Sequence, residues 1–307
     1  MASDMQPSSE PQDNLTEPDY AILLAGNKDP GVPYYIPNIR HLISDSFRQH
    51  LIHSAGNFPE EIEEHCQRIR DKAWAIRAYP CIGLGMFLQP PLLPKHHAYP
   101  AVLERLKETG RMYLDVGAFL GIDMRFLFHD LGGGLEEARK LVANDIVSFW
   151  ELGFEFFNDR TGPFAEGVRF VQADFMNDSA DSPLQKFEGK CDVIEISQVL
   201  HQWTLEQQIH ACMKLVNFSR VEPGSIILGN QVGMVKAKAG AISKTKIFIH
   251  NVETWKEMWR KVEEKTGTKW DVKAELWDWK DMGYDPKLTT FLGGDARLIF
   301  WSSSRVA

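Results

Sequence analysis

A short apolar run at residues 113–123, YLDVGAFLGID, breaks into a loop that contains two glycines, and this break limits how the chain can fold. The first four residues suit a buried parallel strand, and the segment IDMRFLFHDL carries an apolar face at helical spacing. Gly117 and Gly121 would let the backbone approach a ligand, and the start of the helix could bind a ligand carboxylate. The stretch therefore predicts a strand, a tight loop and a helix.

The residues of this loop also favour one kind of ligand. A dinucleotide-binding loop that starts at Gly117 would need glycines where the chain has Phe119 and Ile122. A nucleoside that carries a carboxylate and an ammonium, but no phosphate, fits better, because Asp115 can accept from the ammonium and the loop N–H groups can bind the carboxylate. S-adenosylmethionine has these groups. On this stretch alone, an ordinary strand-to-helix turn remains the alternative.

Strand patterns recur along the rest of the chain, with helical patterns between the first of them. This alternation predicts βαβ units and an α/β fold with a parallel sheet. The next four strand segments are residues 140–146, 168–175, 191–200 and 225–233. Two later segments, 270–279 and 296–304, are separated by a turn-rich stretch and predict a closing antiparallel pair.

The N-terminal third has a different composition. Residues 1–19 are rich in Ser, Pro, Asp and Glu, which predicts a disordered tail. From residue 20 to 105, short helical segments broken by prolines predict an irregular helical cap. Residues 59–80 form its best amphipathic helix, with Ile62, Cys66, Ile69, Ala73 and Ile76 on one face. The Pro- and Gly-rich stretch that follows either packs over the ligand or only against the core.

Composition excludes several classes of partner. The chain of 307 residues has a formal net charge of -8, whereas a nucleic acid or an anionic membrane would require a basic face. Its four cysteines lack metal-site spacing, nothing at the N-terminus resembles a secretion signal, and no apolar run approaches a membrane span. We therefore expect a cytoplasmic protein with a small-molecule substrate, no metal, no nucleic acid and no membrane. A monomer and a homodimer both remain open.

Acidic residues stand at the ends of the second and third predicted strands. Asp145 could accept hydrogen bonds from ribose hydroxyls, and Asp174 could accept one from the exocyclic amine of a purine. The ring of Phe175 could stack on the purine face. Each Asp could instead cap a helix or a turn. Together with Asp115, however, these acids come at successive strand ends, which favours a single ligand site.

Five longer segments resemble one family. RDKAWAIRAYPCIG, LDVGAFLGIDMR, VSFWELGFEFFNDR, GSIILGNQVG and HNVETWKEMWRKVEEKTGTKW are similar to segments of fungal class I S-adenosylmethionine-dependent methyltransferases of secondary metabolism, particularly those of meroterpenoid pathways. The resemblance covers roughly residues 20–300. It implies a Rossmann-like seven-stranded sheet of order 3-2-1-4-5-7-6, an N-terminal helical lid at residues 20–105, and a domain at residues 106–307 that binds S-adenosylmethionine.

The resemblance also implies an activity and site residues. Relatives convert the carboxylic acid of a farnesylated aromatic polyketide, or a product close to it, into a methyl ester. Carried over to this chain, the methionine end of S-adenosylmethionine would be held by Asp115, Gly117 and Gly121. The nucleoside would lie against Asp145, Ile146, Asp174 and Phe175.

Some residues depart from the family pattern. Ala118, Phe119 and Ile122 stand where relatives often have Cys or Gln. Ile249 precedes His250 where many relatives carry Arg. If that Arg binds the acid of the acceptor in relatives, the acid is held differently here.

The fourth predicted strand runs into SQVLHQW, at the crevice where an open α/β sheet binds ligands. His201 is the candidate catalytic base, since a similar VLH-x-W run in small-molecule O-methyltransferases places a His that takes a proton from a phenol. A structural histidine is the alternative. Tyr79, Trp203 and His250 are candidates for substrate contact, although Trp203 could instead pack on the next helix and the position of His250 favours a hydrogen bond at a helix start.

The sequence thus favours an O-methyltransferase that esterifies a carboxylate of a terpenoid or polyketide intermediate. One alternative is a phenol O-methyltransferase in which His201 is the base. Another is a cyclase or binding protein that keeps the fold without transferring methyl groups. An NAD-dependent oxidoreductase is disfavoured by Phe119 and Ile122.

Overall fold

The computed structural model describes residues 28–55, 61–239 and 246–307. The predicted tail at residues 1–19 lies outside these ranges. One seven-stranded sheet has the order β3-β2-β1-β4-β5-β9-β8. Its strands are β1 (Tyr113–Val116), β2 (Leu141–Asp145), β3 (Arg169–Gln172), β4 (Val193–Glu195), β5 (Ile226–Met234), β8 (Trp270–Trp277) and β9 (Ala296–Arg305).

The strand order confirms the predicted topology, because β8 and β9 are the sixth and seventh strands of this sheet. The first five strands are parallel, and β9 runs antiparallel between β5 and β8. The structure differs from the expectation in two places. β4 is shorter than its predicted segment, and a second, two-stranded sheet forms from β6 (Lys238–Ala239) and β7 (Phe248–Ile249).

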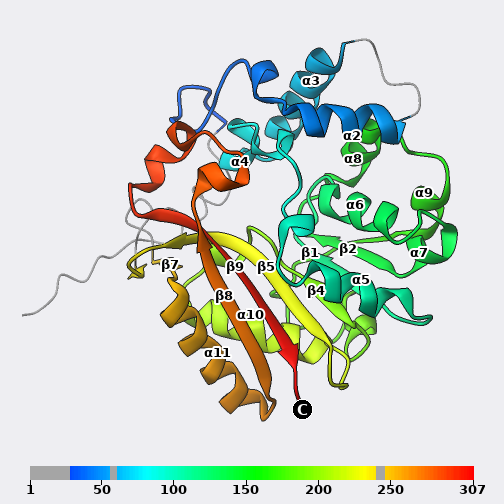
Figure 1. Ribbon diagram of the computed structural model, residues 1–307, viewed down its shortest axis with the longest axis vertical. Coiled ribbons are helices and arrows are strands. Elements are labelled where there is room, and N and C mark those ends of the chain that lie inside the picture. Colours follow the sequence, from blue (N-terminus) through cyan, green and yellow to red (C-terminus); the bar gives the residue numbers. More distant parts are fainter. Residues whose placement is uncertain (1–27, 56–60, 240–245) are drawn as a thin grey trace, which may run out of the picture.

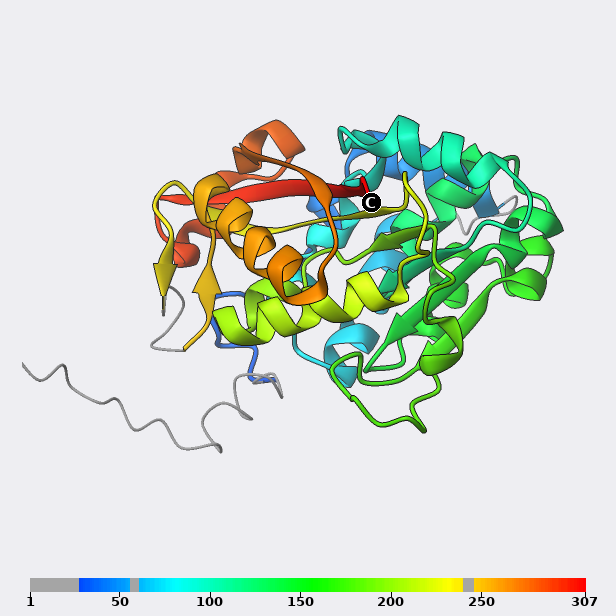
Figure 2. The same cartoon turned by 90° about the horizontal axis from the view of Figure 1, so that it is seen from below.

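Helices cover both faces of the large sheet (Figures 1 and 2). α10 (Leu205–Phe218) and α11 (Val252–Thr266) pack on one face, where their apolar residues join those of β1, β4 and β9. The other face meets α5 (Tyr99–Lys107), α6 (Ile122–Asp130), α7 (Leu135–Arg139), α8 (Trp150–Phe157) and α9 (Pro163–Gly167). Capping boxes start both helices of the first face, Thr204 with Gln207 at α10 and Asn251 with Thr254 at α11.

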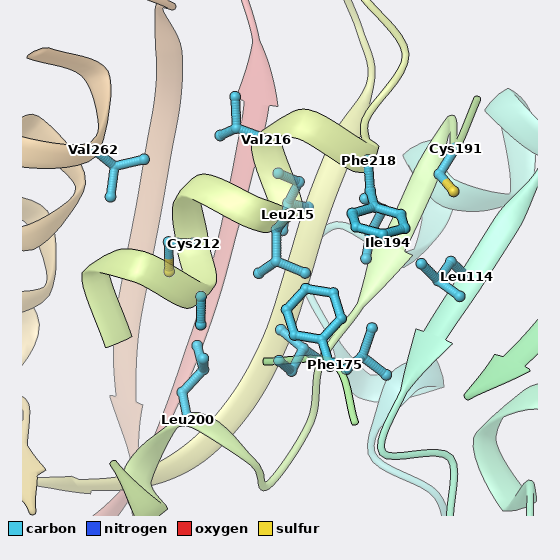
Figure 3. Close-up of a cluster of buried hydrophobic side chains, with 14 of the residues drawn as sticks. Leu114, Phe175, Cys191, Ile194, Leu200, Cys212, Leu215, Val216, Phe218 and Val262 are labelled. Carbon is cyan, nitrogen blue, oxygen red and sulfur yellow. The ribbon is translucent and has the colours of Figure 1, made fainter. Parts of the chain in front are cut away.

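The core beneath α10 is dense and apolar. Figure 3 shows Leu114 and Ile194 of the sheet facing Leu215 and Phe218 of α10, and all four side chains are buried. Burial of each such side chain contributes about 1.5–3 kcal/mol. This core holds α10 against β1 and β4, and the Cys191 N–H donates to the Phe218 carbonyl, which places the end of the helix at the amino end of β4.

The cap consists of α2 (Asp45–Ala55), α3 (Ile62–Ile76), α4 (Pro80–Gly83), and the short 3-10 helices η1 (Arg40–Leu42), η2 (Met86–Leu88) and η3 (Leu93–Lys95). Figure 1 shows it along the edge opposite the chain's C-terminus. Four of the five predicted α3 positions are buried, but Ile76 is 43% exposed because the helix ends there. The cap packs on Phe119 and on Phe156 and Phe157 of α8. The division at residue 105 stays a prediction; α5 packs with the sheet.

Candidate functional site

The loop between β1 and α6 has a left-handed backbone at three positions. φ is +85° at Gly117, +51° at Phe119 and +68° at Gly121. A Cβ on Gly117 would lie 2.5 Å from Val199 Cγ2, and one on Gly121 would lie 2.9 Å from the Trp150 ring. Both positions therefore require glycine for packing within the protein as well as for backbone conformation. Whether they also approach a ligand stays a prediction.

Phe119 is strained and is held from two sides. A positive φ at a bulky residue costs roughly 1–3 kcal/mol and persists only where the surroundings enforce it. Its N–H donates to Asp145 Oδ2 at 2.9 Å. Its ring packs edge-on against Phe149 and Phe87, with centroids 4.9 and 5.8 Å away. The loop is thus fixed both to the end of β2 and to the cap.

Arg125 of α6 also holds this loop, and the sequence did not predict that role. Its side chain is 1% exposed and donates to the carbonyl oxygens of Leu120 and Gly121 at 2.6 and 3.2 Å. It also forms two hydrogen bonds to Asp159, at 2.6 and 3.0 Å. The guanidinium therefore satisfies loop carbonyls that would otherwise lack a partner in an apolar surrounding.

Asp145 lies at the end of β2 and faces this loop. It is 7% exposed, and it accepts hydrogen bonds from the N–H groups of Phe119 and Val147, both at 2.9 Å. Burial raises the pKa of its carboxyl, although these hydrogen bonds oppose that shift. The next residue, Ile146, is 54% exposed. A carboxylate and an exposed aliphatic side chain therefore lie side by side at this strand end, which suits a sugar and a flat apolar base.

The predicted role of the Phe175 ring is not supported by its position. The ring is 5% exposed and packs on Phe218 at 5.7 Å, inside the core that Figure 3 shows. It does not present a face for stacking, because the chain turns it toward α10. Asp174 is exposed, two residues past the end of β3, and accepts from the N–H of Met176 at 2.8 Å.

Three carboxyl groups meet beneath the loop. Asp115 and Glu195 are direct neighbours on β1 and β4, and Asp123 lies in the first turn of α6. Glu195 accepts from the hydroxyls of Tyr113 and Ser197, and Asp123 accepts from the N–H of Leu93.

Asp115 is 6% exposed, and its carboxyl group has no hydrogen-bond partner in the part of the chain that the structure describes. Burial, followed by the charges of Glu195, Asp123 and Asp145, raises its pKa well above the usual range. Burial and Asp123 likewise raise the pKa of Glu195. Adjacent buried carboxylates cannot all be ionised without a counter-charge. The cluster therefore suits a cationic ligand group, and the ammonium and sulfonium of S-adenosylmethionine fit this requirement.

Polar side chains continue from this cluster toward the end of β4. The Ser197 hydroxyl accepts from Asn230 Nδ2 at 3.1 Å, and Gln198 Nε2 donates to Asn230 Oδ1 at 2.7 Å. Gln198 has φ +58° and donates its backbone N–H to the Asn230 carbonyl. This network carries the chain out of β4 into η5 (Leu200–Gln202), where the candidate base lies.

His201 is partly buried in η5. Its Nδ1 is buried and has no hydrogen-bond partner among the described residues. Burial lowers the pKa of the imidazole to about 4. The ring is therefore neutral at pH 7 and only weakly basic.

The other predicted substrate contacts differ in placement. Tyr79 of the cap packs near Phe149, and burial raises the pKa of its phenol to about 12. Trp203 is half-buried against the α10 core, and its carbonyl accepts from Phe248 N–H at 3.1 Å. His250 is fully buried, with Nδ1 3.0 Å from Thr254 Oγ1 at the start of α11. That contact matches the alternative role, a hydrogen bond at a helix start.

Within residues 28–55, 61–239 and 246–307, no group of three His, Cys, Asp or Glu side chains could hold a metal ion. In the same ranges, no helix combines the length and the hydropathy needed to cross a membrane.

Residues 34–88 match the family described as the meroterpenoid methyltransferase N-terminal domain. The chain is 31% identical over 220 residues to O-methyltransferase phiE of Fungal sp. (strain ATCC 74256), covering 70% of this chain and 69% of that protein. It is 29% identical over 257 residues to O-methyltransferase atr3 of Stereocaulon alpinum, covering 82% and 71%.

A solved structure with a similar fold is the Burkholderia thailandensis 1,6-didemethyltoxoflavin-N1-methyltransferase with bound 1,6-didemethyltoxoflavin and S-adenosylhomocysteine. Its TM-score is 0.48 at 12% identity, covering 82% of this chain and 92% of that one. Family membership depends instead on the sequence relatives. The chain belongs to the family of fungal S-adenosylmethionine-dependent O-methyltransferases of secondary metabolism.

Proposed function

We propose that this enzyme methylates the carboxylate of a hydrophobic terpenoid- or polyketide-derived acid to give a methyl ester. The observation that carries the choice of acceptor is the state of His201, whose pKa burial lowers to about 4. A carboxylic acid with an ordinary pKa of about 4 is already ionised at pH 7, so its oxygen can attack without a base. A phenol, with a pKa of about 10, benefits from a base whose pKa lies near the working pH.

S-adenosylmethionine supplies an activated methyl group on a sulfonium. The carboxylate oxygen forms a bond to the methyl carbon while the C–S bond breaks and its electron pair stays on sulfur. No proton is transferred in this step. The chain's residues therefore act by alignment and by exclusion of water. Asp145 would hold the ribose, Ile146 would contact the adenine, and Asp115 would pair with the ammonium.

The acceptor would enter from the cap side. Tyr79 on the cap and Trp203 after β4 would offer aromatic surface to it, which suits a terpenoid or aromatic acceptor. We also place the enzyme in the cytoplasm. Its four cysteines are free thiols, which suits a reducing compartment.

The decisive assay uses a strain that lacks this protein. The compound that accumulates there, lighter than the normal product by one methylene, is incubated with the purified enzyme and methyl-labelled S-adenosylmethionine. We expect label in the product, and release of that label as methanol on mild alkaline hydrolysis, because esters hydrolyse and aryl methyl ethers do not. Label that survives hydrolysis would mean a phenol acceptor. Turnover without label would mean a cyclase.

Asp145→Asn should weaken binding of S-adenosylhomocysteine by about tenfold to a hundredfold. Each charge-assisted hydrogen bond to ribose contributes roughly 1.5–3 kcal/mol, and about 1.4 kcal/mol corresponds to a factor of ten. Asparagine keeps an oxygen for only one of the N–H groups of Phe119 and Val147, so the midpoint of unfolding should also fall, and affinity is compared at a temperature where both proteins are folded. Calorimetry measures the affinity, and Asp174→Asn, at an exposed strand end, should have a smaller effect. An unchanged affinity in Asp145→Asn would remove this residue from the donor site.

A further inference from the structure

Arg77 directly follows α3 and leads the chain toward Tyr79 and α4. Its backbone is extended, with φ -150° and ψ 128°, because the helix ends one residue earlier. Its guanidinium lies over the Tyr79 ring, 5.3 Å from the centroid. The side chain therefore extends from the cap along the segment predicted to lie over the ligand.

Arg77 lacks an anionic partner, as does the exposed Arg68 of α3, whose guanidinium instead bonds the His65 ring at 3.0 Å. Arg40, Arg48 and Arg70 pair with Glu64, Glu63 and Asp71 respectively. In the described part of the chain, the Arg77 side chain has neither an ion pair nor a hydrogen bond, and its Nε is buried. A half-buried guanidinium without a hydrogen-bond partner costs free energy of folding unless a ligand group binds it.

The charge of Arg77 acts on two side chains of the candidate site. It opposes the effect of burial on Asp145 and on Tyr79, in both of which burial raises the pKa. The Tyr79 ring under Arg77 lies 6.4 Å from the Phe149 ring, which in turn packs 4.9 Å from the ring of Phe119, so Arg77 lies on the same side of the cap as the donor loop. Its distance from Asp145 nevertheless exceeds that of an ion pair, so the guanidinium N–H groups are not consumed by that carboxylate.

The remaining charges around the donor loop are negative. The groups that act on Asp115 are Glu195, Asp123 and Asp145, and no cation is among them. Arg125, the arginine nearest the loop in sequence, is already paired with Asp159. A ligand that carries a carboxylate into this site thus needs a cation, and Arg77 supplies one that no carboxylate of the described residues pairs with.

We propose that Arg77 binds a ligand carboxylate at the junction of the cap and the donor loop. A guanidinium can donate two parallel hydrogen bonds to a carboxylate, which fixes orientation as well as charge. This inference rests on the proposed function, which makes two carboxylates available. One belongs to the amino-acid end of the methyl donor, and the other belongs to the acceptor acid. Both present the same chemistry to Arg77.

The test compares Arg77→Gln and Arg77→Lys with Arg68→Gln, an exposed arginine on α3. Calorimetry measures binding of S-adenosylhomocysteine and of 5′-methylthioadenosine, which has the nucleoside but lacks the amino-acid end. If Arg77 binds the donor carboxylate, Arg77→Gln weakens binding of S-adenosylhomocysteine at least tenfold and leaves binding of 5′-methylthioadenosine unchanged. If it binds the acceptor, both affinities stay and KM for the accumulated acid rises at least tenfold, with kcat nearly constant.

Arg77→Lys should recover part of either loss, because it keeps the charge but not the paired hydrogen bonds. Equal weakening of both nucleosides, or no change in any of these quantities, would overturn the role of Arg77. Failure of the proposed function is a separate result. It would appear in the unsubstituted enzyme, as no binding of S-adenosylhomocysteine or no alkali-labile label.

Discussion

Arg125→Leu should destabilise the enzyme by roughly 3–5 kcal/mol, the usual cost of removing one partner of a buried ion pair. The substitution would leave the Leu120 carbonyl without its 2.6 Å donor and would leave Asp159 unpaired. It would also remove a cation that lies 4.4 Å from the ring centroids of Phe157 and Phe164. For a chain of this length, the melting temperature should fall by roughly 5–8 °C.

Arg160→Leu is the matched control. Its ion pair with Glu151 joins side chains that are 62% and 68% exposed, and such pairs contribute at most about 1 kcal/mol. The melting temperature of Arg125→Lys should lie between those of Arg125→Leu and Arg160→Leu, because lysine keeps the charge but cannot bond both the loop carbonyls and Asp159. If Arg125→Leu melts no earlier than Arg160→Leu, the loop is held by other contacts, of which the Phe119 hydrogen bond is the first candidate.

The sheet was predictable because each of its strands leaves a local pattern. The buried parallel strands are short apolar runs, and the loop glycines mark where β1 ends. The end of β4 was placed too late because Ile196, Val199 and Leu200 continue an apolar pattern after Glu195. Gln198, however, adopts φ +58° to bond Asn230, and no local signal gives that partner. Likewise, the spacing of apolar residues in α3 predicted its buried face. It did not predict that Ile76, the last residue of the helix, is exposed.

The side chains of the site were harder to predict, because their environment depends on strand register and on helices distant in sequence. Asp115 and Glu195 become neighbours only through the pairing of β1 with β4. The available signal was an acid inside an apolar strand, which is rarely buried without a functional or structural partner. Phe175 comes just after the edge strand β3, and side chains that follow a strand of such a sheet can face a ligand. Its direction is instead set by Phe218, on a helix that the sequence does not place relative to β3.

His201→Ala distinguishes the two acceptors, and we expect the carboxylate outcome. Proton transfer from a phenol of pKa about 10 to an imidazole whose pKa burial lowers to about 4 is uphill by about six units, or roughly 8 kcal/mol. The ring is therefore poorly suited to act as a base, although its unpartnered Nδ1 can accept a hydrogen bond. Removing it should raise KM and lower kcat by less than about tenfold.

The pH profiles supply the second readout. Burial depresses the pKa of His201, so the neutral form persists in the folded enzyme down to about pH 4, and the profile of kcat/KM should show no inflection from this residue near 6.5. His201→Gln, which keeps a hydrogen-bonding side chain, should restore much of the lost KM. Between about pH 7 and 9 the defect of His201→Ala should stay constant, because a carboxylate acceptor remains ionised throughout. A loss of about a hundredfold that shrinks as the pH approaches 10 would instead make His201 a general base and the acceptor a phenol.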